Sequence, residues 1–204
     1  MQIQRQILGE VQTNSYLLET EDVRIVVDPA ECTNEMVEFL NSASTEKLIL
    51  LTHAHFDHIK GASELRDKTN VKIAIFELDA PATDNGSLNL SSYFGIYSTP
   101  FKADMLLKDN DIIKLGKTEI KVMHTPGHTV GSACFLIGDI LISGDTLFNL
   151  SIGRTDFPGG SFETIKQSLK KLMTLDDNIK VYSGHGEATT IGKERKINPY
   201  LKEI

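Results

Sequence analysis

Short stretches in which apolar residues alternate with polar ones, or run together, predict the strands of this chain. In the first half they lie at residues 2–8, 14–19, 23–27, 47–51 and 71–76. Helical spacing of apolar residues predicts helices at 33–42 and 59–68, with a short helical turn at 77–82. The first half therefore alternates strands with helices, which is typical of a layered α/β fold.

The second half repeats this order of strands followed by helix. Strands are predicted at 111–115, 119–124, 132–137, 140–143 and 180–182, and a helix at 162–172. Two similar halves favour a pseudo-repeated sandwich, with two sheets face to face and helices outside. We predict one domain over residues 1–204, because no low-complexity segment or linker divides the chain.

Residues 83–105 interrupt this regular pattern. The segment is rich in Ser, Asn and Gly, and four aromatic residues are spread along it: Tyr93, Phe94, Tyr97 and Phe101. A loop of this length in a compact domain is usually functional or mobile. The sequence leaves open whether it takes part in function or is a connector whose aromatic side chains fill the core.

Composition restricts the partners more than it identifies them. Of the 204 residues, 40% are hydrophobic and 24% are charged, which is a globular balance. The net charge of −7 makes nucleic acid a poor candidate partner, because phosphate binding favours basic surfaces. We find no signal peptide and no apolar run of about 18 residues, so we expect a cytoplasmic protein without membrane contact. The two cysteines are expected to be reduced thiols.

Three of the six histidines lie within six residues, directly after the apolar strand predicted at 47–51. They are His53, His55 and His58, and Asp57 precedes the third. Imidazole and carboxylate groups are ligands of zinc and iron. Packing alone rarely requires four such groups after one strand. The run therefore predicts a metal site, and two metals side by side could share this one segment.

Further candidate ligands follow later strands. His128 comes after Pro126 and Gly127, Asp145 follows Gly144, and His185 lies between two glycines. Glycine lets the backbone approach an ion or a substrate closely. Each position alone is weak evidence, since a turn aspartate or a capping histidine is common. Together they place a polar ligand at the end of each of three strands.

In this order the seven positions resemble the ligand signature of the metallo-β-lactamase superfamily. Residues 125–132, 144–148 and 153–160, with Gly184-His185-Gly186, are similar to the short, single-domain glyoxalase II-like hydrolases. The resemblance implies the αββα sandwich of that superfamily, with two mixed sheets face to face and helices outside. It also implies an enzyme with two divalent metal ions. Zinc is the first expectation, and iron or manganese would suit the same ligands.

The resemblance also implies how the ligands are divided. The first metal would be held by His53, His55 and His128. The second would be held by Asp57, His58 and His185, with Asp145 as the bridge. Two close metal ions lower the pKa of a bridging water to about 7, so that hydroxide is the nucleophile. Asp57 is also the catalytic candidate, since it can orient that hydroxide.

The expected partner is a small-molecule acyl thioester such as S-lactoylglutathione. Glyoxalase II enzymes carry a C-terminal helical domain that helps to hold glutathione, and we expect this chain to lack it. The resemblance also implies that Arg154 stands where the longer glyoxalase II enzymes place a basic residue for a substrate carboxylate, although Asp156 could instead neutralise it. Lys193 and Arg195 are further candidates for an anionic contact, with plain surface solvation as the alternative.

Other reactions stay open at this point. A mononuclear-iron persulfide dioxygenase has a similar Gly-Arg-Thr-Asp-Phe stretch, and lactone or other ester hydrolases share the metal motif. The acidic charge argues against a nuclease, and the full ligand set argues against a binding protein that has lost catalysis. His124 and Asp28 are expected to pack or to support ligands rather than to bind metal. The oligomeric state is not predicted.

Overall fold

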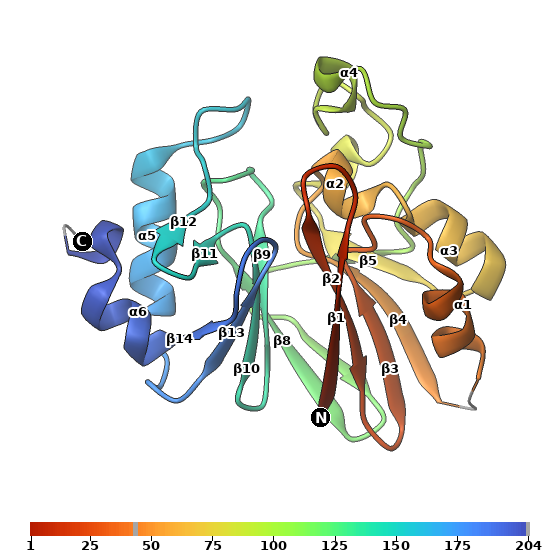
Figure 1. The fold of residues 1–204 in the computed structure, drawn as a ribbon, viewed down its shortest axis with the longest axis horizontal. Coiled ribbons are helices and arrows are strands. Elements are labelled where there is room, and N and C mark those ends of the chain that lie inside the picture. Colours follow the sequence, from red (N-terminus) through yellow and green to blue (C-terminus); the bar gives the residue numbers. More distant parts are fainter. Residues whose placement is uncertain (43–44, 203–204) are drawn as a thin grey trace.

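The computed structural model describes residues 1–42 and 45–202, and two six-stranded mixed sheets form its centre. The first sheet has the order β1 (Gln2–Leu8), β2 (Thr13–Glu19), β3 (Val23–Val27), β4 (Glu46–Leu51), β5 (Ile73–Phe76) and β6 (Met105–Leu107). The second sheet has the order β14 (Thr189–Thr190), β13 (Lys180–Ser183), β10 (Ile140–Gly144), β9 (Ala133–Ile137), β8 (Thr118–His124) and β7 (Ile112–Leu115). The two sheets face each other across the middle of the molecule (Figure 1).

Strand directions within the sheets explain where loops collect. In the first sheet β3, β4, β5 and β6 are parallel, whereas β1 and β2 form an antiparallel hairpin. In the second sheet β10 and β13 are parallel neighbours. The carboxyl ends of parallel strands meet at one edge of a sheet, which is where α/β folds place their sites.

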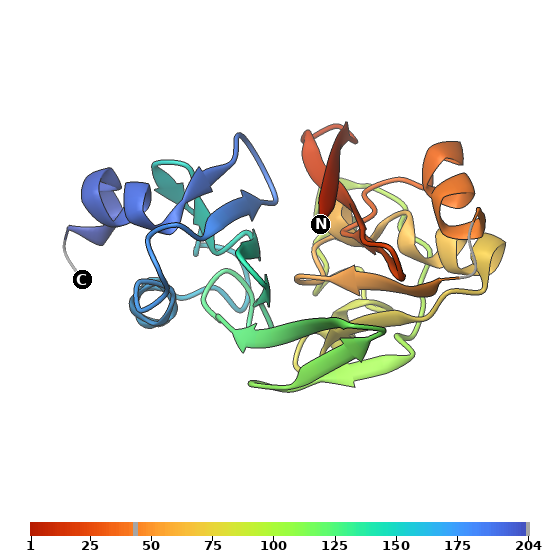
Figure 2. The same cartoon turned by 90° about the horizontal axis from the view of Figure 1, so that it is seen from below.

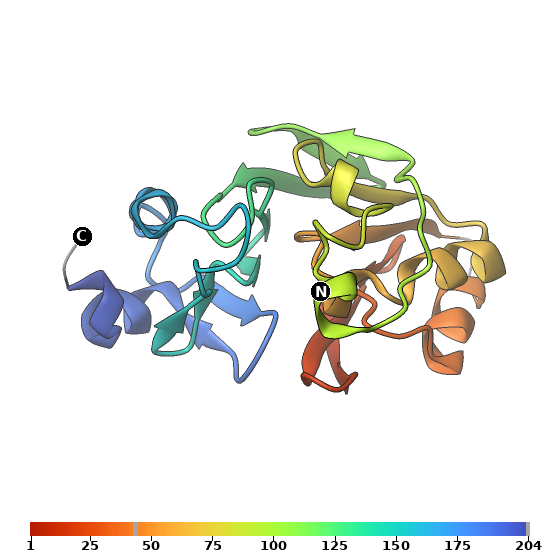
Figure 3. The ribbon, with the colours of Figure 1, turned by 90° about the horizontal axis from the view of Figure 1, so that it is seen from above.

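Helices cover the outer faces of both sheets. Helices α1 (Asn34–Asn41) and α3 (Ala62–Thr69) lie outside the first sheet, and α5 (Phe162–Leu172) and α6 (Ile191–Ile197) lie outside the second (Figures 1 and 2). Shorter elements surround one end of the sandwich: α2 (Phe56–Ile59), η1 (Ala80–Ala82), α4 (Ser91–Phe94) and the hairpin β11 (Leu147–Phe148) to β12 (Ser151–Ile152). The turn η2 (Pro199–Leu201) follows α6. Figure 3 shows the end that carries α4.

Three apolar clusters hold these four layers together. One lies between the two sheets and includes Val27, Leu50 and Phe135, all fully buried. The second joins the first sheet to α1 and α3, and the third joins the second sheet to α5 and α6. Sheets covered on both faces need apolar residues on both sides of each strand, which explains the continuous apolar run at the end of β4. The predicted αββα sandwich is therefore confirmed.

The structure corrects some element predictions. The helix predicted at 59–68 begins only at Ala62, as α3, and the separate short helix α2 precedes it, with Gly61 between the two. The amide of Gly61 donates to the carbonyl of Pro29, and a Cβ at Gly61 would overlap the backbone of Glu31. This close approach breaks the helix. The predictions missed several short elements, each of four residues or fewer: α2, β6, α4, β11, β12, β14 and η2.

The predicted domain range 1–204 includes residues 43–44 and 203–204, which lie outside the described residues. Across residues 1–42 and 45–202, none of the helices has both the length and the apolar character needed to cross a membrane.

Candidate metal centre

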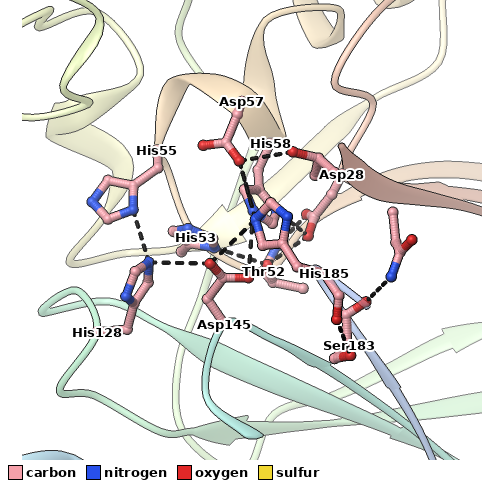
Figure 4. Close-up of polar contacts among 12 residues, drawn as sticks. Asp28, Thr52, His53, His55, Asp57, His58, His128, Asp145, Ser183 and His185 are labelled. Atoms are coloured by element: carbon pink, nitrogen blue, oxygen red, sulfur yellow. Dashed lines mark hydrogen bonds and ion pairs between the residues drawn. The ribbon is translucent and has the colours of Figure 1, made fainter. Parts of the chain in front are cut away.

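The seven predicted ligands converge at one end of the sandwich. His53 and His55 follow β4, and Asp57 and His58 lie in α2, directly behind them. The other three come from the second sheet, where each follows the end of a strand: His128 after β8, Asp145 after β10 and His185 after β13. Figure 4 shows these side chains pointing toward one another.

The side chains form two groups of three residues, and the seventh residue, Asp145, lies between them. In the first group, ligand atoms of His53, His55 and His128 all lie within 4.8 Å of one another, and His55 Nδ1 is 2.8 Å from His128 Nε2. In the second group, Asp57 Oδ2 is 3.3 Å from both His58 Nε2 and His185 Nε2. These are the two groups that the resemblance implied.

Asp145 lies between the two groups (Figure 4). Its Oδ2 is 3.5 Å from His128 Nε2 and 3.6 Å from His185 Nε2, while its Oδ1 is 3.5 Å from His58 Nε2. One carboxylate thus faces imidazoles of both groups. This is the position that a bridging ligand requires.

Unpaired buried atoms show that the cluster fits metal ions. His53 Nε2, His55 Nε2, His58 Nε2 and Asp145 Oδ1 are buried and have no hydrogen-bond partner among the described residues. A buried polar atom without a partner costs about 1–3 kcal/mol, so several at one point are unusual in a folded protein. Imidazole nitrogens and carboxylate oxygens are the donors that zinc, iron and manganese accept. Metal ions would satisfy His53 Nε2, His58 Nε2 and Asp145 Oδ1, whereas His55 turns its other nitrogen, Nδ1, toward His128 and the cluster.

Burial sets the protonation state of the first group. It holds the pKa of His53 and of His55 well below 6.5, and neighbouring imidazoles, above all those of His58 and His128, lower both further. Both rings are therefore neutral at physiological pH. Neutral imidazole is the form that binds metal.

The second group has the opposite character. Burial by itself would lower the pKa of His58, but the carboxylates of Asp57, Asp145 and Asp28 outweigh burial and raise it well above 6.5. Burial by itself would raise the pKa of Asp57, yet the imidazoles of His58 and His185 hold it well below 3.8. Without metal, the carboxylates are thus compensated by protonated imidazole. A bound cation would replace that proton.

Asp28 supports the centre from behind His58. Its Oδ2 lies 2.9 Å from His58 Nδ1, and its carboxylate also accepts hydrogen bonds from Thr52 N and Thr52 Oγ1. Although Asp28, His53 and His58 lie close enough to form a third group, Asp28 faces the opposite ring nitrogen from the one near Asp57. We therefore assign it to orienting His58, since ligating histidines are commonly held by a carboxylate at their other nitrogen.

Asp79 is a support that the sequence analysis missed. It follows β5, and its buried carboxylate accepts from Ala54 N at 3.0 Å, Gly131 N at 2.7 Å and Thr129 Oγ1 at 2.8 Å. Ala54 lies between His53 and His55, and Thr129 follows His128. One side chain therefore joins the loops that carry the first group. Its place after a neighbouring parallel strand was the only signal in the sequence.

Gly184 is needed because the chain passes very close to the ligands. A Cβ at this position would overlap Asp145 Oδ1 and His58 Cε1. Only glycine lets the end of β13 approach the centre without displacing them.

The basic candidates have other partners. Arg154 lines the cavity above the centre, but its guanidinium forms two hydrogen bonds to Asp156, at 2.7 and 2.6 Å. Lys193 Nζ donates to Asn149 Oδ1, and Arg195 donates to backbone carbonyls beyond α5 and pairs with Asp177. Neither Lys193 nor Arg195 is among the described residues that line the cavity. A role of these three in substrate binding stays a prediction.

His124 takes no part in the cluster. Its ring stacks on Phe76 at 4.2 Å, and its Nε2 lies 2.9 Å from the carbonyl of Val130. These are the packing contacts expected for it.

Comparisons with known proteins agree with this geometry. A family model described as "Metallo-beta-lactamase superfamily" matches residues 8–185. "Probable metallo-hydrolase YqgX" of Bacillus subtilis is 35% identical, over 98% of this chain and 98% of its own. "Hydroxyacylglutathione hydrolase GloC" of Haemophilus influenzae is 32% identical, over 93% and 92% respectively. The crystal structure of "BLEG-1 B3 metallo-beta-lactamase" has a TM-score of 0.91 and 35% identity, covering 98% of this chain and 99% of its own.

Proposed function

Since the chain belongs to the metallo-beta-lactamase superfamily, with the histidine and aspartate cluster of a metal site, we propose that it hydrolyses acyl thioesters at a two-metal centre. The observation that carries the proposal is the position of Asp145, within 3.6 Å of imidazoles from both ligand groups. Such a bridge is useful only if both groups hold an ion. The relative named as a hydroxyacylglutathione hydrolase supports a thioester as the substrate.

The residues divide the work as follows. His53, His55 and His128 would hold one ion, and Asp57, His58 and His185 would hold the other. When bound, a pair of divalent ions polarises the scissile carbonyl and activates water at neutral pH. No serine or cysteine nucleophile is then needed, and the buried Cys134 has a pKa raised to about 11 by burial, which leaves it unreactive.

Asp57 is the candidate for orienting the attacking water. Its pKa lies well below 3.8, so it is ionised and can accept a proton in a hydrogen bond. Thr13 Oγ1 donates to Asp57 Oδ2 at 2.8 Å and fixes the carboxylate from the β1–β2 hairpin. This leaves Asp57 oriented toward both His58 and His185.

The test measures metal content and substrate range on the same preparation. We expect two metal ions per chain and turnover of acyl thioesters, with S-lactoylglutathione as the first substrate to assay. Lactones, a β-lactam and glutathione persulfide with O₂ uptake are assayed in parallel. One iron per chain with O₂ uptake would establish the dioxygenase alternative, and turnover of β-lactam or lactone without thioester would refute the proposed substrate.

His124 provides a matched control. His128→Gln removes a ligand of the first group, so we expect it to lower both bound metal and activity. His124→Gln changes the same residue type four positions earlier, outside the cluster, and should keep both. Equal loss in the two variants would contradict the assignment of the ligands.

A further inference from the structure

A cavity of about 360 Å³ opens directly above the ligand cluster. His55, His128 and His185 form its floor together with Asp57 and Asp145. Its walls are mainly apolar: Val11, Leu90, Phe94, Phe148, Ile152 and Phe157. This volume is near the lower limit for small-molecule sites. It can enclose the acyl part of a thioester, whereas a whole peptide thiol would extend into solvent.

Aromatic side chains from separate segments meet on the wall near the first ligand group. Phe157 lies edge-to-face with His55, and Phe94 lies edge-to-face with Phe157, both with ring centroids 6.1 Å apart. Phe56 supports Phe94 from α2, at 5.5 Å. Phe94 is 49% exposed and Phe157 is partly buried, and both line the cavity with ring surface. Exposed aromatic surface beside a reactive centre favours an apolar ligand.

The loop that carries Phe94 is held in place. At its base Thr83 Oγ1 donates to the carbonyl of Phe101 at 2.7 Å. In its middle the carbonyl of Asn89 accepts from Phe56 N, at 2.9 Å, next to the ligands of α2. The backbone on both sides of Phe94 is therefore tied down, at Asn89 to α2 and at Phe101 to Thr83. Preorganisation of this kind reduces the entropy lost on binding.

Among the described residues, the cavity wall offers no uncommitted Lys or Arg side chain to an anionic substrate. Arg154 is the only Lys or Arg among the described residues that line it. Its guanidinium is bonded to both oxygens of Asp156 and lies 3.9 Å above the Phe157 ring. The charge is thus compensated, and the side chain covers the aromatic wall. A substrate carboxylate placed here would have to share the guanidinium with Asp156.

From these observations, and on the basis of the proposed thioester hydrolysis, we infer that the enzyme prefers thioesters with an uncharged, apolar acyl group seated against Phe94 and Phe157. The scissile carbonyl then lies at the ligand cluster, and the thiol part of the substrate extends out of the cavity into solvent. Lactoyl, which is short and hydroxylated, uses little of this wall.

The test compares acyl thioesters of one uncharged thiol: acetyl, butanoyl, hexanoyl, lactoyl and succinyl. We expect kcat/KM to rise about fourfold for each added methylene between acetyl and hexanoyl. Lactoyl should fall below butanoyl, and succinyl, which carries a carboxylate, should be poorest. Phe157→Ala and Phe94→Ala should each flatten this rise and reduce hexanoyl turnover about tenfold more than acetyl turnover.

Phe162→Ala is the matched control, because Phe162 is an exposed aromatic residue at the start of α5, outside the cavity. It should leave the whole series unchanged. Phe94 and Phe157 lie on different segments, so one variant remains informative if the other fails to fold. Equal rates along the series, or a preference for succinyl, would overturn the apolar acyl site while thioester hydrolysis stands. No turnover of any thioester by protein loaded with two metals would overturn both.

Discussion

Replacing Asp79 by Asn tests whether this buried carboxylate positions the metal ligands. Its two oxygens accept from two backbone amides and one hydroxyl, in the loops beside His53, His55 and His128. An asparagine side chain has one acceptor oxygen and one donor NH₂ group. Whichever way it is turned, the NH₂ group faces either the amide of Ala54 or that of Gly131. One backbone donor is therefore left without an acceptor.

The one backbone donor left without an acceptor sets the expected loss of stability. An unsatisfied buried donor costs about 1–3 kcal/mol, so the free energy of unfolding should fall by about 2 kcal/mol. The loops that it holds carry the first ligand group, and loss of a residue that orients ligands typically lowers metal affinity about 10- to 100-fold. Gly131 already packs tightly against Asp79, since a Cβ at this position would overlap it. The Gly131 backbone therefore has little room to move so that a lost hydrogen bond is replaced.

The pH dependence gives an independent check. Burial raises the pKa of Asp79 above 3.8, even though its three hydrogen bonds act to lower it. The folded state therefore binds this proton more tightly than the unfolded state, and the contribution of Asp79 to stability falls as pH rises from 3.8 through the raised pKa. Asparagine has no such proton. In metal-free protein, the stability deficit of Asp79→Asn should thus be smaller near pH 7 than near pH 4.

The assay combines urea unfolding with a metal titration of the purified chains. Asp104→Asn is the control, since Asp104 Oδ2 accepts a single bond, from Ile73 N at 2.8 Å, at the other end of β5. An amide oxygen can keep that bond, so this variant should retain both stability and metal affinity. If Asp79→Asn binds metal as tightly as the unchanged protein, the positioning argument is refuted.

Further predictions follow from single contacts. Gly184→Ala should weaken metal binding without unfolding the protein, because its Cβ meets Asp145 and His58; an unchanged titration would contradict the close approach. Glu194→Ala should destabilise the chain by about 3 kcal/mol in urea unfolding but keep its metal. Glu194 is fully buried and accepts from Leu150 N at 2.8 Å and Asn198 Nδ2 at 2.9 Å, away from the centre. Removing metal with a chelator should lower the melting temperature and reloading should restore it, whereas equal melting curves would contradict a metal-linked fold.

The sequence predicted the longer elements because their patterns are local. The apolar run before Thr52 and the amphipathic stretch of α5 can be read without knowing their neighbours. The break before α3 cannot be read in this way, because it depends on contact between Gly61 and residues 29–31, about thirty positions away. Strand β6 was missed because three residues are too few for a periodic pattern.

The candidate site was likewise only partly predictable from the sequence. The ligand types and their places after strands were visible in the sequence, and the structure brings all seven together. Asp79 was not visible, because an acidic residue after a strand is common and its three donors come from other loops. The cavity walls were equally hidden. The aromatic residues of 83–105 could be counted, but only the fold shows that Phe94 faces the cavity while Phe101 is buried in the core.

The distribution of ligands between the two sheets links metal binding to the fold. His53 and His55 follow the first sheet while their partner His128 follows the second, and Asp57 and His58 are joined by His185 in the same way. Each ion of the proposed pair therefore joins both halves of the sandwich. Because the unfolded chain cannot present these ligands together, the free energy of metal binding adds to that of folding. The aromatic wall of the cavity is also built from both halves of the chain, since Phe94 belongs to the first half and Phe157 to the second. Binding metal thus fixes the distance between the walls that are proposed to select the substrate.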